Sequence, residues 1–299
     1  ANIPIALGIA GCIVLTGTDL SAGRVVGLTA CISASLLQSM DYATKMFPNL
    51  QPLPIPVVIL IVVVVGGIVG FVNGWFVAQF KLHPFIVTLA TQLITYGVLL
   101  LYIMINGNNG QPLSGLDNSF KNFVTGSLVK FFGVPIPNYV WYAIIMIAFM
   151  WFMWNKTTFG KNMFAVGSNP EAANVSGVSV FWTTIVVHTL AGCMYGITGF
   201  IESARIGSNQ ANTGLNYECD AIAACVIGGV SMSGGRGTVL GALLGSLILA
   251  TIAKALPLIP FFDQLWLNTI KGVIILVVVV VNIVLQRTAD KNALKGREM

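Results

Sequence analysis

NKTTFGKNMFAVGSNPEAANVSGVSV, residues 155–180, is the longest polar connection in the chain that carries helix signals, and it joins two strongly apolar segments. Asn169 is a good N-cap, because its side-chain oxygen can accept a hydrogen bond from an otherwise free backbone N–H. Pro170 follows at the first helical position, Glu171 places negative charge in the first turn, and Gly177 can end the helix in a left-handed conformation. The stretch therefore predicts a helix of about two turns.

A helix of this length is not stable alone in water, so the rest of the chain or a partner must hold it. Ala172 and Ala173 extend the helix and give it a face of small side chains. An ordinary surface helix between two membrane spans and a docking element both fit this pattern.

The composition is that of a helical membrane protein. Hydrophobic residues make up 56% of the chain and charged residues 8%, and the mean hydropathy is +0.86. A soluble domain contains about 25% charged residues. The alternating pattern of an outer-membrane barrel is missing. The basic residues behind the net charge of +5 are scattered between apolar runs, which indicates topology signals rather than nucleic-acid binding.

Nine apolar segments are candidates for membrane spans. They run approximately over 1–17, 22–40, 54–80, 85–106, 138–155, 179–202, 216–233, 237–256 and 265–286. We therefore expect one all-α transmembrane domain over 1–299, a polytopic bundle. The chain begins at Ala1 within an apolar run, without the charged region or cleavage site of a signal peptide. We thus expect a further span to precede it, for about ten in the full subunit.

Lysine and arginine favour cytoplasmic loops and set the orientation. If 155–178 is cytoplasmic, alternation of the spans places a set of basic residues inside: Arg24, Lys81, Lys156, Lys161, Arg236, Arg287, Lys291, Lys295 and Arg297. The polar connections 41–53 and 107–137 then lie outside. Two similar turns, DLSAGRVVG at 19–27 and MSGGRGTVLG at 232–241, are expected at the cytoplasmic headgroups.

Glycine is abundant, with 32 residues, and recurs at four-residue spacing within the spans. The spacings involve Gly66, Gly67, Gly70 and Gly74, then Gly192 and Gly196, and finally Gly237, Gly241 and Gly245. Small residues at this spacing let helix backbones approach closely. We favour packing within the chain over a seam between two copies.

Enzymatic signatures are missing from the sequence. It contains no GxxxxGK[ST], HExxH or GxSxG motif, so no catalytic residue is expected. The five cysteines have no metal-type spacing and are expected to be small buried residues, so no metal site is expected. His188, within a span, is interpreted as a packed, hydrogen-bonded side chain.

Ionisable residues within the spans are few. Glu218 and Asp220 begin the seventh segment, Glu202 and Arg205 end the sixth, and all four are expected near the outer interface. The polar residues at depth are mostly neutral: Asn73, Thr88, Thr91, Gln92, Thr95 and His188. Such residues suit a path for an uncharged hydrophilic solute, and they equally suit hydrogen bonds between helices. For a solute path we single out Asn73, Gln92 and Asp220.

The segment 157–178 strongly resembles the cytoplasmic coupling segment of permeases in the ribose- and galactoside-type branch of bacterial ABC importers. The shared pattern, T-x-x-G-[KR]-x-x-x-A-[VI]-G-x-N-x-x-A-A-x-x-x-G-[IV], falls on Thr157, Gly160, Lys161, Ala165, Val166, Gly167, Asn169, Ala172, Ala173, Gly177 and Val178. The resemblance continues in GTDLSAGR at 17–24 and in YECDAIAACVIGGVSMSGGRGTVLG at 217–241. Galactose/methyl-galactoside members of the family are the most similar in NKTTFGKN and NPEAANVSGV.

The resemblance implies a multi-pass subunit of the bacterial inner membrane that imports a monosaccharide or simple glycoside, galactose or methyl-galactoside favoured. It implies a second permease copy, surrounding lipid, cytoplasmic ABC ATPase subunits and a periplasmic sugar-binding protein, with no cofactor on this chain and with ATP and Mg on the ATPase. The residues implied to couple to the ATPase are Gly160, Lys161, Ala165, Val166, Gly167, Asn169, Pro170, Glu171, Ala172, Ala173 and Gly177.

A short rigid helix is physically suited to dock in a groove on the ATPase, with Lys156 and Lys161 adding complementary charge. Displacement of the groove would then pass to the spans 138–155 and 179–202. The alternative is a passive channel or facilitator, which has no need of the 155–178 segment. A purely structural scaffold is disfavoured by the polar residues at depth.

Overall fold

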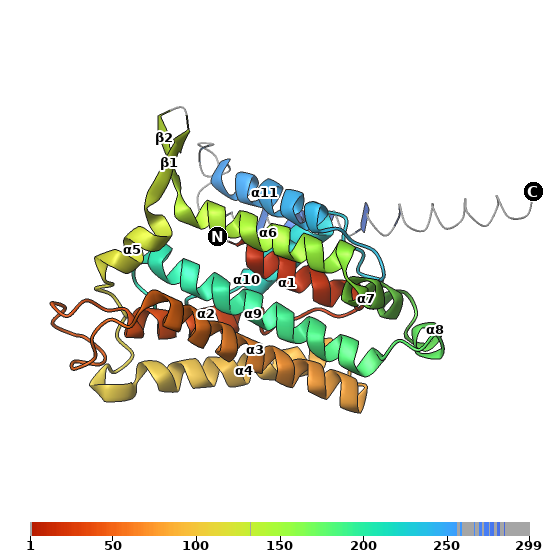
Figure 1. Cartoon of the computed structure of the whole chain (residues 1–299), viewed down its shortest axis with the longest axis horizontal. Coiled ribbons are helices and arrows are strands. Elements are labelled where there is room, and N and C mark those ends of the chain that lie inside the picture. Colours follow the sequence, from red (N-terminus) through yellow and green to blue (C-terminus); the bar gives the residue numbers. More distant parts are fainter. Residues whose placement is uncertain are drawn as a thin grey trace, which may run out of the picture.

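The computed structural model describes residues 2–131, 133–255 and scattered positions between 258 and 284, and these residues form a helical bundle (Figure 1). Its elements are α1 (Ile3–Val14), α2 (Ala22–Leu36), α3 (Ile55–Phe80), α4 (Pro84–Ile103), η1 (Ile105–Gly107), α5 (Asn118–Thr125), β1 (Ser127–Phe131), β2 (Val134–Pro137), α6 (Asn138–Lys156), α7 (Thr158–Ser168), α8 (Pro170–Val175), α9 (Val180–Ile206), α10 (Tyr217–Ile227) and α11 (Val239–Ala255). Much of the ninth predicted segment, 265–286, lies outside the described residues.

The central element is α9, which packs against α1, α2 and α3 and is largely buried. One hydrophobic core joins α9 to α1, α6, α7 and α10, and a second joins it to α2, α3, α4 and α5. By contrast, most apolar side chains of α3 and α4 are at least partly exposed. Such surfaces are normal where a helix faces lipid or another subunit.

Three of the described helices, α3, α4 and α9, are long and apolar enough to cross a bilayer. Three others are shorter than the predicted segments 1–17, 22–40 and 216–233. The helices α1, α2 and α10 have 12, 15 and 11 residues. At ~1.5 Å per residue they reach ~16–23 Å, against a hydrocarbon thickness of ~30 Å. They are helix segments that begin or end inside the bundle.

The connections gather at two ends of the bundle, as alternation of the segments predicts (Figure 1). The α8 end gathers three stretches: the α3–α4 connection, the α7–α8 segment and the α10–α11 connection (Figure 1). Here Gly235 N–H, in the α10–α11 connection, donates to the carbonyl of Val14 at the end of α1, at 2.9 Å. At the hairpin end, residues 37–54, 104–137 and 207–216 meet. Their backbones pair at Gln38 with Leu116 and at Leu113 with Asn209.

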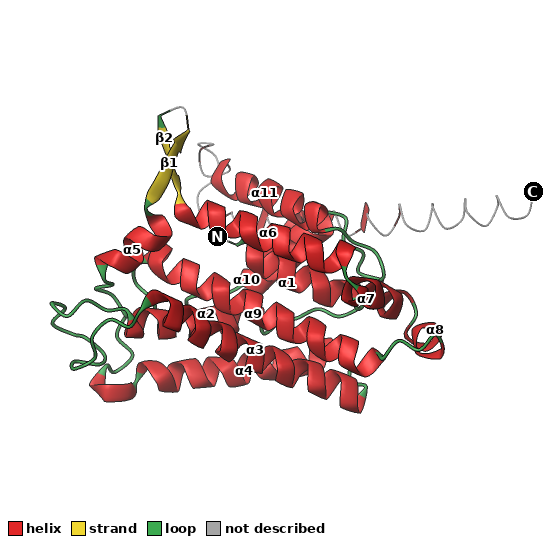
Figure 2. Cartoon of the chain, in the orientation of Figure 1, coloured by secondary structure: helices red, strands yellow, loops and turns green. Residues whose placement is uncertain are grey.

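The polar connection 107–137 contains a short helix and a two-stranded hairpin, within the otherwise helical part of the chain that the structure describes (Figure 2). The helix α5 begins at an Asp117 cap, whose carboxylate accepts from Ser119 N–H at 2.8 Å. After it, β1 and β2 form an antiparallel hairpin. Gly133 has φ +79°, which a tight reversal between strands often requires of glycine.

The glycine spacing serves packing within the chain, as favoured from the sequence. A Cβ on Gly66 would lie 2.2 Å from the Gly192 carbonyl oxygen, and one on Gly192 would lie 2.1 Å from that of Gly66. A Cβ on Gly196 would likewise lie 2.2 Å from the Val62 carbonyl oxygen. Glycine at these positions is what lets α3 and α9 run in backbone contact.

Candidate functional site

The segment between α6 and α9 contains two helices, where the sequence predicts one. The predicted helix is present as α8, with its cap as expected: the Asn169 side-chain oxygen accepts from Ala172 N–H at 3.0 Å. Gly177 also takes the expected left-handed conformation, with φ +83°. The additional helix is α7, whose N-terminus is capped by the Thr157 hydroxyl accepting from Gly160 N–H at 3.3 Å.

Two glycines of α7 fix the segment against the bundle. A Cβ on Gly160 would lie 2.0 Å from the Trp154 carbonyl oxygen, and one on Gly167 would lie 1.9 Å from the Val14 carbonyl oxygen. The same Val14 carbonyl receives Gly235 N–H. The coupling segment thus contacts the end of α1 and the α10–α11 connection, so that a force on α7 would reach both.

The two alanines of α8 have different surroundings: one faces solvent and the other packs against the rest of the chain. Ala172 is exposed, whereas Ala173 is only 5% exposed and packs inside the chain. The expectation that both alanines face a partner is therefore wrong for Ala173. Val175 is 90% exposed, the most exposed of the large apolar side chains on the described helices. Sequence reasoning did not single it out, although an apolar residue in a polar loop was the available signal.

The remaining residues of the predicted coupling segment differ in how far they are buried. Val166 is buried, Ala165 is half-buried, and Lys161 is exposed. Pro170 and Glu171 lie at the edge of a cavity of about 830 Å³. The cavity extends between α3, α4 and α9 and reaches His188 within the bundle.

A second group of polar residues lies deep in the bundle, between α2, α4 and α10. Gln92, near the middle of α4, donates from Nε2 to Glu218 Oε1 at 3.4 Å. The guanidinium of Arg24 lies 4.2 Å from the centre of the Tyr96 ring and donates to the Ala211 carbonyl at 3.1 Å. The second carboxylate oxygen of Glu218 is buried with no hydrogen-bond partner among the described residues.

These positions correct two expectations from the sequence. Arg24 is not at the cytoplasmic headgroups, and Glu218 is not near an interface, because both face the middle of α4. The reason is that α2 and α10 begin within the bundle, after the connections 15–21 and 207–216 have entered it. Discontinuous helices of this kind place polar groups at depth in transporters.

The three residues predicted to line a solute path lie in two parts of the bundle. Asn73 is fully buried and donates from Nδ2 to the Ser21 hydroxyl at 3.0 Å. Gln92 lies beside Glu218, and Asp220 is half-buried in the first turn of α10. Gln92 and Asp220 thus share the region where α10 begins, whereas Asn73 faces the α1–α2 connection.

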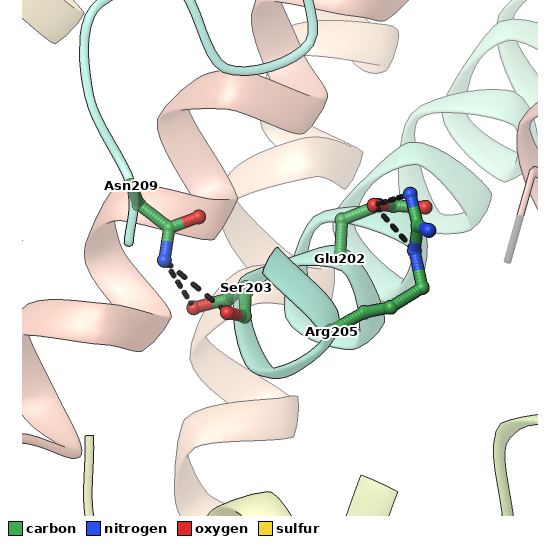
Figure 3. Close-up of polar contacts among 4 residues, drawn as sticks. All are labelled: Glu202, Ser203, Arg205 and Asn209. Atoms are coloured by element: carbon green, nitrogen blue, oxygen red, sulfur yellow. Dashed lines mark hydrogen bonds and ion pairs between the residues drawn. The ribbon is translucent and has the colours of Figure 1, made fainter. Parts of the chain in front are cut away.

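At the hairpin end, α9 ends in the polar contacts of Figure 3. Arg205 bends back onto Glu202 and donates from Nε and Nη2 to one carboxylate oxygen, at 2.9 and 2.7 Å. Asn209 points to Ser203 and donates to its hydroxyl at 3.1 Å. Glu202 and Arg205 thus lie at the hairpin end of α9, with Glu202 fully buried, and their location near the outer interface stays a prediction. These contacts fix the 207–216 connection where it leaves α9.

A helical bundle with discontinuous helices, polar groups at depth and a capped helix pair at one end defines a membrane transport component. Comparison with known proteins agrees: residues 3–281 match the family described as branched-chain amino acid transport system / permease component, and the chain belongs to this family. It is therefore a permease component of the inner membrane and not an enzyme.

Individual relatives in the family are sugar permeases. The chain is 48% identical to the galactose/methyl galactoside import permease protein MglC of Escherichia coli K12, over 92% of this chain and 81% of that protein. The MglC protein of Haemophilus influenzae is 46% identical over 93% and 82%. The ribose import permease protein RbsC of Bacillus subtilis is 34% identical over 93% and 80%. No solved structure gives a significant match.

Proposed function

We propose that this chain is the permease subunit of an ATP-driven importer for a monosaccharide or simple glycoside, with galactose or methyl-galactoside favoured. The supporting observation is 48% identity over 92% of the chain to a galactose/methyl galactoside import permease, against 34% to a ribose permease. The proposed assembly has two permease copies in lipid, a cytoplasmic ABC ATPase that binds ATP and Mg²⁺, and a periplasmic sugar-binding protein.

In this proposal residues 1–299 form one transmembrane domain with nine spans, and 155–178 couples to the ATPase. The exposed face of α8, formed by Ala172 and Val175, would enter the ATPase groove. Because Gly167 packs on the carbonyl of Val14, movement of α8 and α7 would pass to α1 and then to the connection leading into α2. That connection holds Ser21, the partner of Asn73, and α2 carries Arg24 beside Tyr96 of α4.

The function is tested by uptake of labelled galactose in cells that express this chain with its ATPase and binding protein. We expect accumulation above the external concentration that methyl-galactoside inhibits more strongly than ribose, and co-purification of the ATPase in mild detergent. Equilibration without accumulation, unchanged when the ATPase is deleted, would instead identify the passive facilitator.

The proposed orientation places the α8 end in the cytoplasm. Among the described residues, the basic side chains divide almost evenly between the α8 end and the hairpin end. The orientation inferred from lysine and arginine therefore depends on four residues of the C-terminal tail that lie outside the described residues: Arg287, Lys291, Lys295 and Arg297. We expect a cysteine at Asn118 to react with an impermeant reagent in whole cells, and a cysteine at Asn174 to react only after permeabilisation. Both substitutions are made with the partly accessible Cys193 and Cys219 replaced by serine. Labelling of both sites in whole cells would contradict the orientation.

For the solute path we propose the polar residues where α10 begins, Gln92, Asp220 and Glu218, with Asn73 further along. Sugar hydroxyls both donate and accept hydrogen bonds, so amide and carboxylate groups at depth can recognise them. We expect Gln92→Ala to lower uptake about tenfold, since a hydrogen bond to a charged group contributes ~1.5–3 kcal/mol. The control is Gln51→Ala, an exposed glutamine of the hairpin end. Equal uptake by both variants would assign Gln92 a packing role.

A further inference from the structure

Next to Ser21, the hydrogen-bond partner of Asn73, three potential metal ligands meet in the interior. They are Cys12 of α1, Asp19 of the α1–α2 connection and His188 of α9, all at most 1% exposed. Their ligand atoms all lie within 4.8 Å of one another. Because 176 positions separate Cys12 from His188, the spacing of cysteines along the sequence could not reveal this cluster.

The carboxylate of Asp19 is oriented but only half satisfied. Its Oδ1 accepts from Ser21 N–H at 2.9 Å and from the Ser21 hydroxyl at 2.6 Å. Its Oδ2 is buried and receives no hydrogen bond within 3.5 Å from the described residues, and no ion pair of Asp19 is found among them. A fully buried carboxylate without a counter-charge is strongly unfavourable, so this site calls for a cation.

The other two ligands have a separation that suits zinc. Cys12 Sγ lies 3.6 Å from His188 Nδ1. Tetrahedral Zn²⁺, with Zn–S of ~2.3 Å and Zn–N of ~2.0–2.1 Å, requires a sulfur–nitrogen distance of about 3.6 Å. The Tyr195 hydroxyl is also buried and lies beside Cys12 and Asp19, close enough to interact with both. It is the candidate for a fourth, oxygen ligand.

We propose that Cys12, Asp19 and His188 bind a zinc ion, with the Tyr195 hydroxyl or a water at the fourth position. A thiolate and a carboxylate balance the two positive charges of Zn²⁺, which leaves a neutral centre suited to an apolar interior. Sulfur and imidazole donors exclude Mg²⁺ and Ca²⁺, which take oxygen ligands. The ion would fasten α1 and the α1–α2 connection to α9, and α7 contacts both α1 and α9.

The site also has a route of entry. The cavity of about 830 Å³ at the α8 end reaches His188, and Glu171 and His83 lie along its wall. A cation could therefore come as far as His188 from the side of α8. Site geometry and an entry path are among the features that a real metal site must show.

The test measures zinc in the full chain, purified in mild detergent with an affinity tag that contains no histidine. We expect about one zinc per chain in the wild type and at least a tenfold loss in Cys12→Ser and His188→Gln. The matched control is Cys225→Ser, because Cys225 is a fully buried cysteine outside the cluster, and it should keep its zinc. Substoichiometric zinc in the wild type, or equal zinc in Cys12→Ser and Cys225→Ser, would overturn the proposal.

A second measurement uses the wild type alone, so that the answer does not depend on whether a variant folds. A ligand that binds the folded state raises its stability by mass action. Removal of the metal with a chelator should lower the unfolding temperature, and Zn²⁺ but not Mg²⁺ should restore it. An unfolding temperature that does not respond to chelation and to Zn²⁺ would contradict the site.

Discussion

Ala172→Asp is expected to leave the amount of permease in the membrane unchanged while abolishing its association with the ATPase, and with it sugar uptake. Ala172 is exposed on α8, so the isolated permease can hydrate the new carboxylate and still fold. In the assembled transporter the same carboxylate would be buried without a partner, at a cost of ~3–5 kcal/mol. Such a cost weakens an interface by more than about a hundredfold.

The experiment is a co-purification, with sugar-stimulated ATP hydrolysis as the second readout. Val175→Asp should behave as Ala172→Asp does, because Val175 is the apolar residue that α8 presents to solvent. The matched control is Val134→Asp in β2, which makes the same change at a valine that is 64% exposed at the opposite end of the bundle. If Ala172→Asp and Val175→Asp retain the ATPase and full uptake, α8 is not the coupling element.

Ala173→Asp, although it lies in the same pattern, is not a useful test of docking. Ala173 is packed inside the chain, so a carboxylate there would disturb the seating of α8 before any partner binds. The sequence shows that α8 forms and where it begins and ends, because caps are local features. It does not show which face of α8 the chain itself covers, since that depends on residues far away in sequence.

The lack of information on distant contacts also explains why the sequence placed Arg24 and Glu218 near the membrane surfaces and not deep in the bundle. A hydropathy pattern places polar residues near membrane surfaces when each apolar run is assumed to be one continuous helix. Arg24 and Glu218 lie at depth because α2 and α10 begin inside the bundle, where Gly23 approaches Glu218 closely. A Cβ on Gly23 would lie 2.0 Å from Glu218 Oε2. Gly23 beside Arg24 in an apolar run is a local signal of a close contact. The sequence does not show that the partner in this contact is Glu218.

The glycine spacing was more informative, because it predicts a close helix contact whose partner the structure then supplies. Gly66, Gly70 and Gly74 of α3 face a stretch of α9 that includes Gly192. Cys12, Asp19 and His188 represent the opposite case. Each has an ordinary interpretation in its own segment, and only the packing of α1 against α9 brings them together.

Gly192→Leu is expected to remove most of the folded permease. The first added carbon would lie 2.1 Å from the Gly66 carbonyl oxygen and 3.0 Å from Gly70 N, and both are backbone atoms that cannot rotate away. Overpacking of side chains costs ~1–3 kcal/mol, and a collision between two helix backbones can exceed that range. The helices α3 and α9 would have to separate along the seam that holds the centre of the bundle.

The control is Gly97→Leu, because Gly97 also lies in an apolar helix, α4, but a Cβ there meets no atom within 4 Å. Fluorescence-detected size-exclusion chromatography in mild detergent should show a monodisperse peak for Gly97→Leu and little or none for Gly192→Leu. Gly192→Ala should fall between them, since its single carbon already meets Gly66 while the rest of the leucine is missing. Equal recovery of Gly192→Leu and Gly97→Leu would mean that α3 and α9 are not held in backbone contact, and the transmission of movement through α9 would then need another explanation.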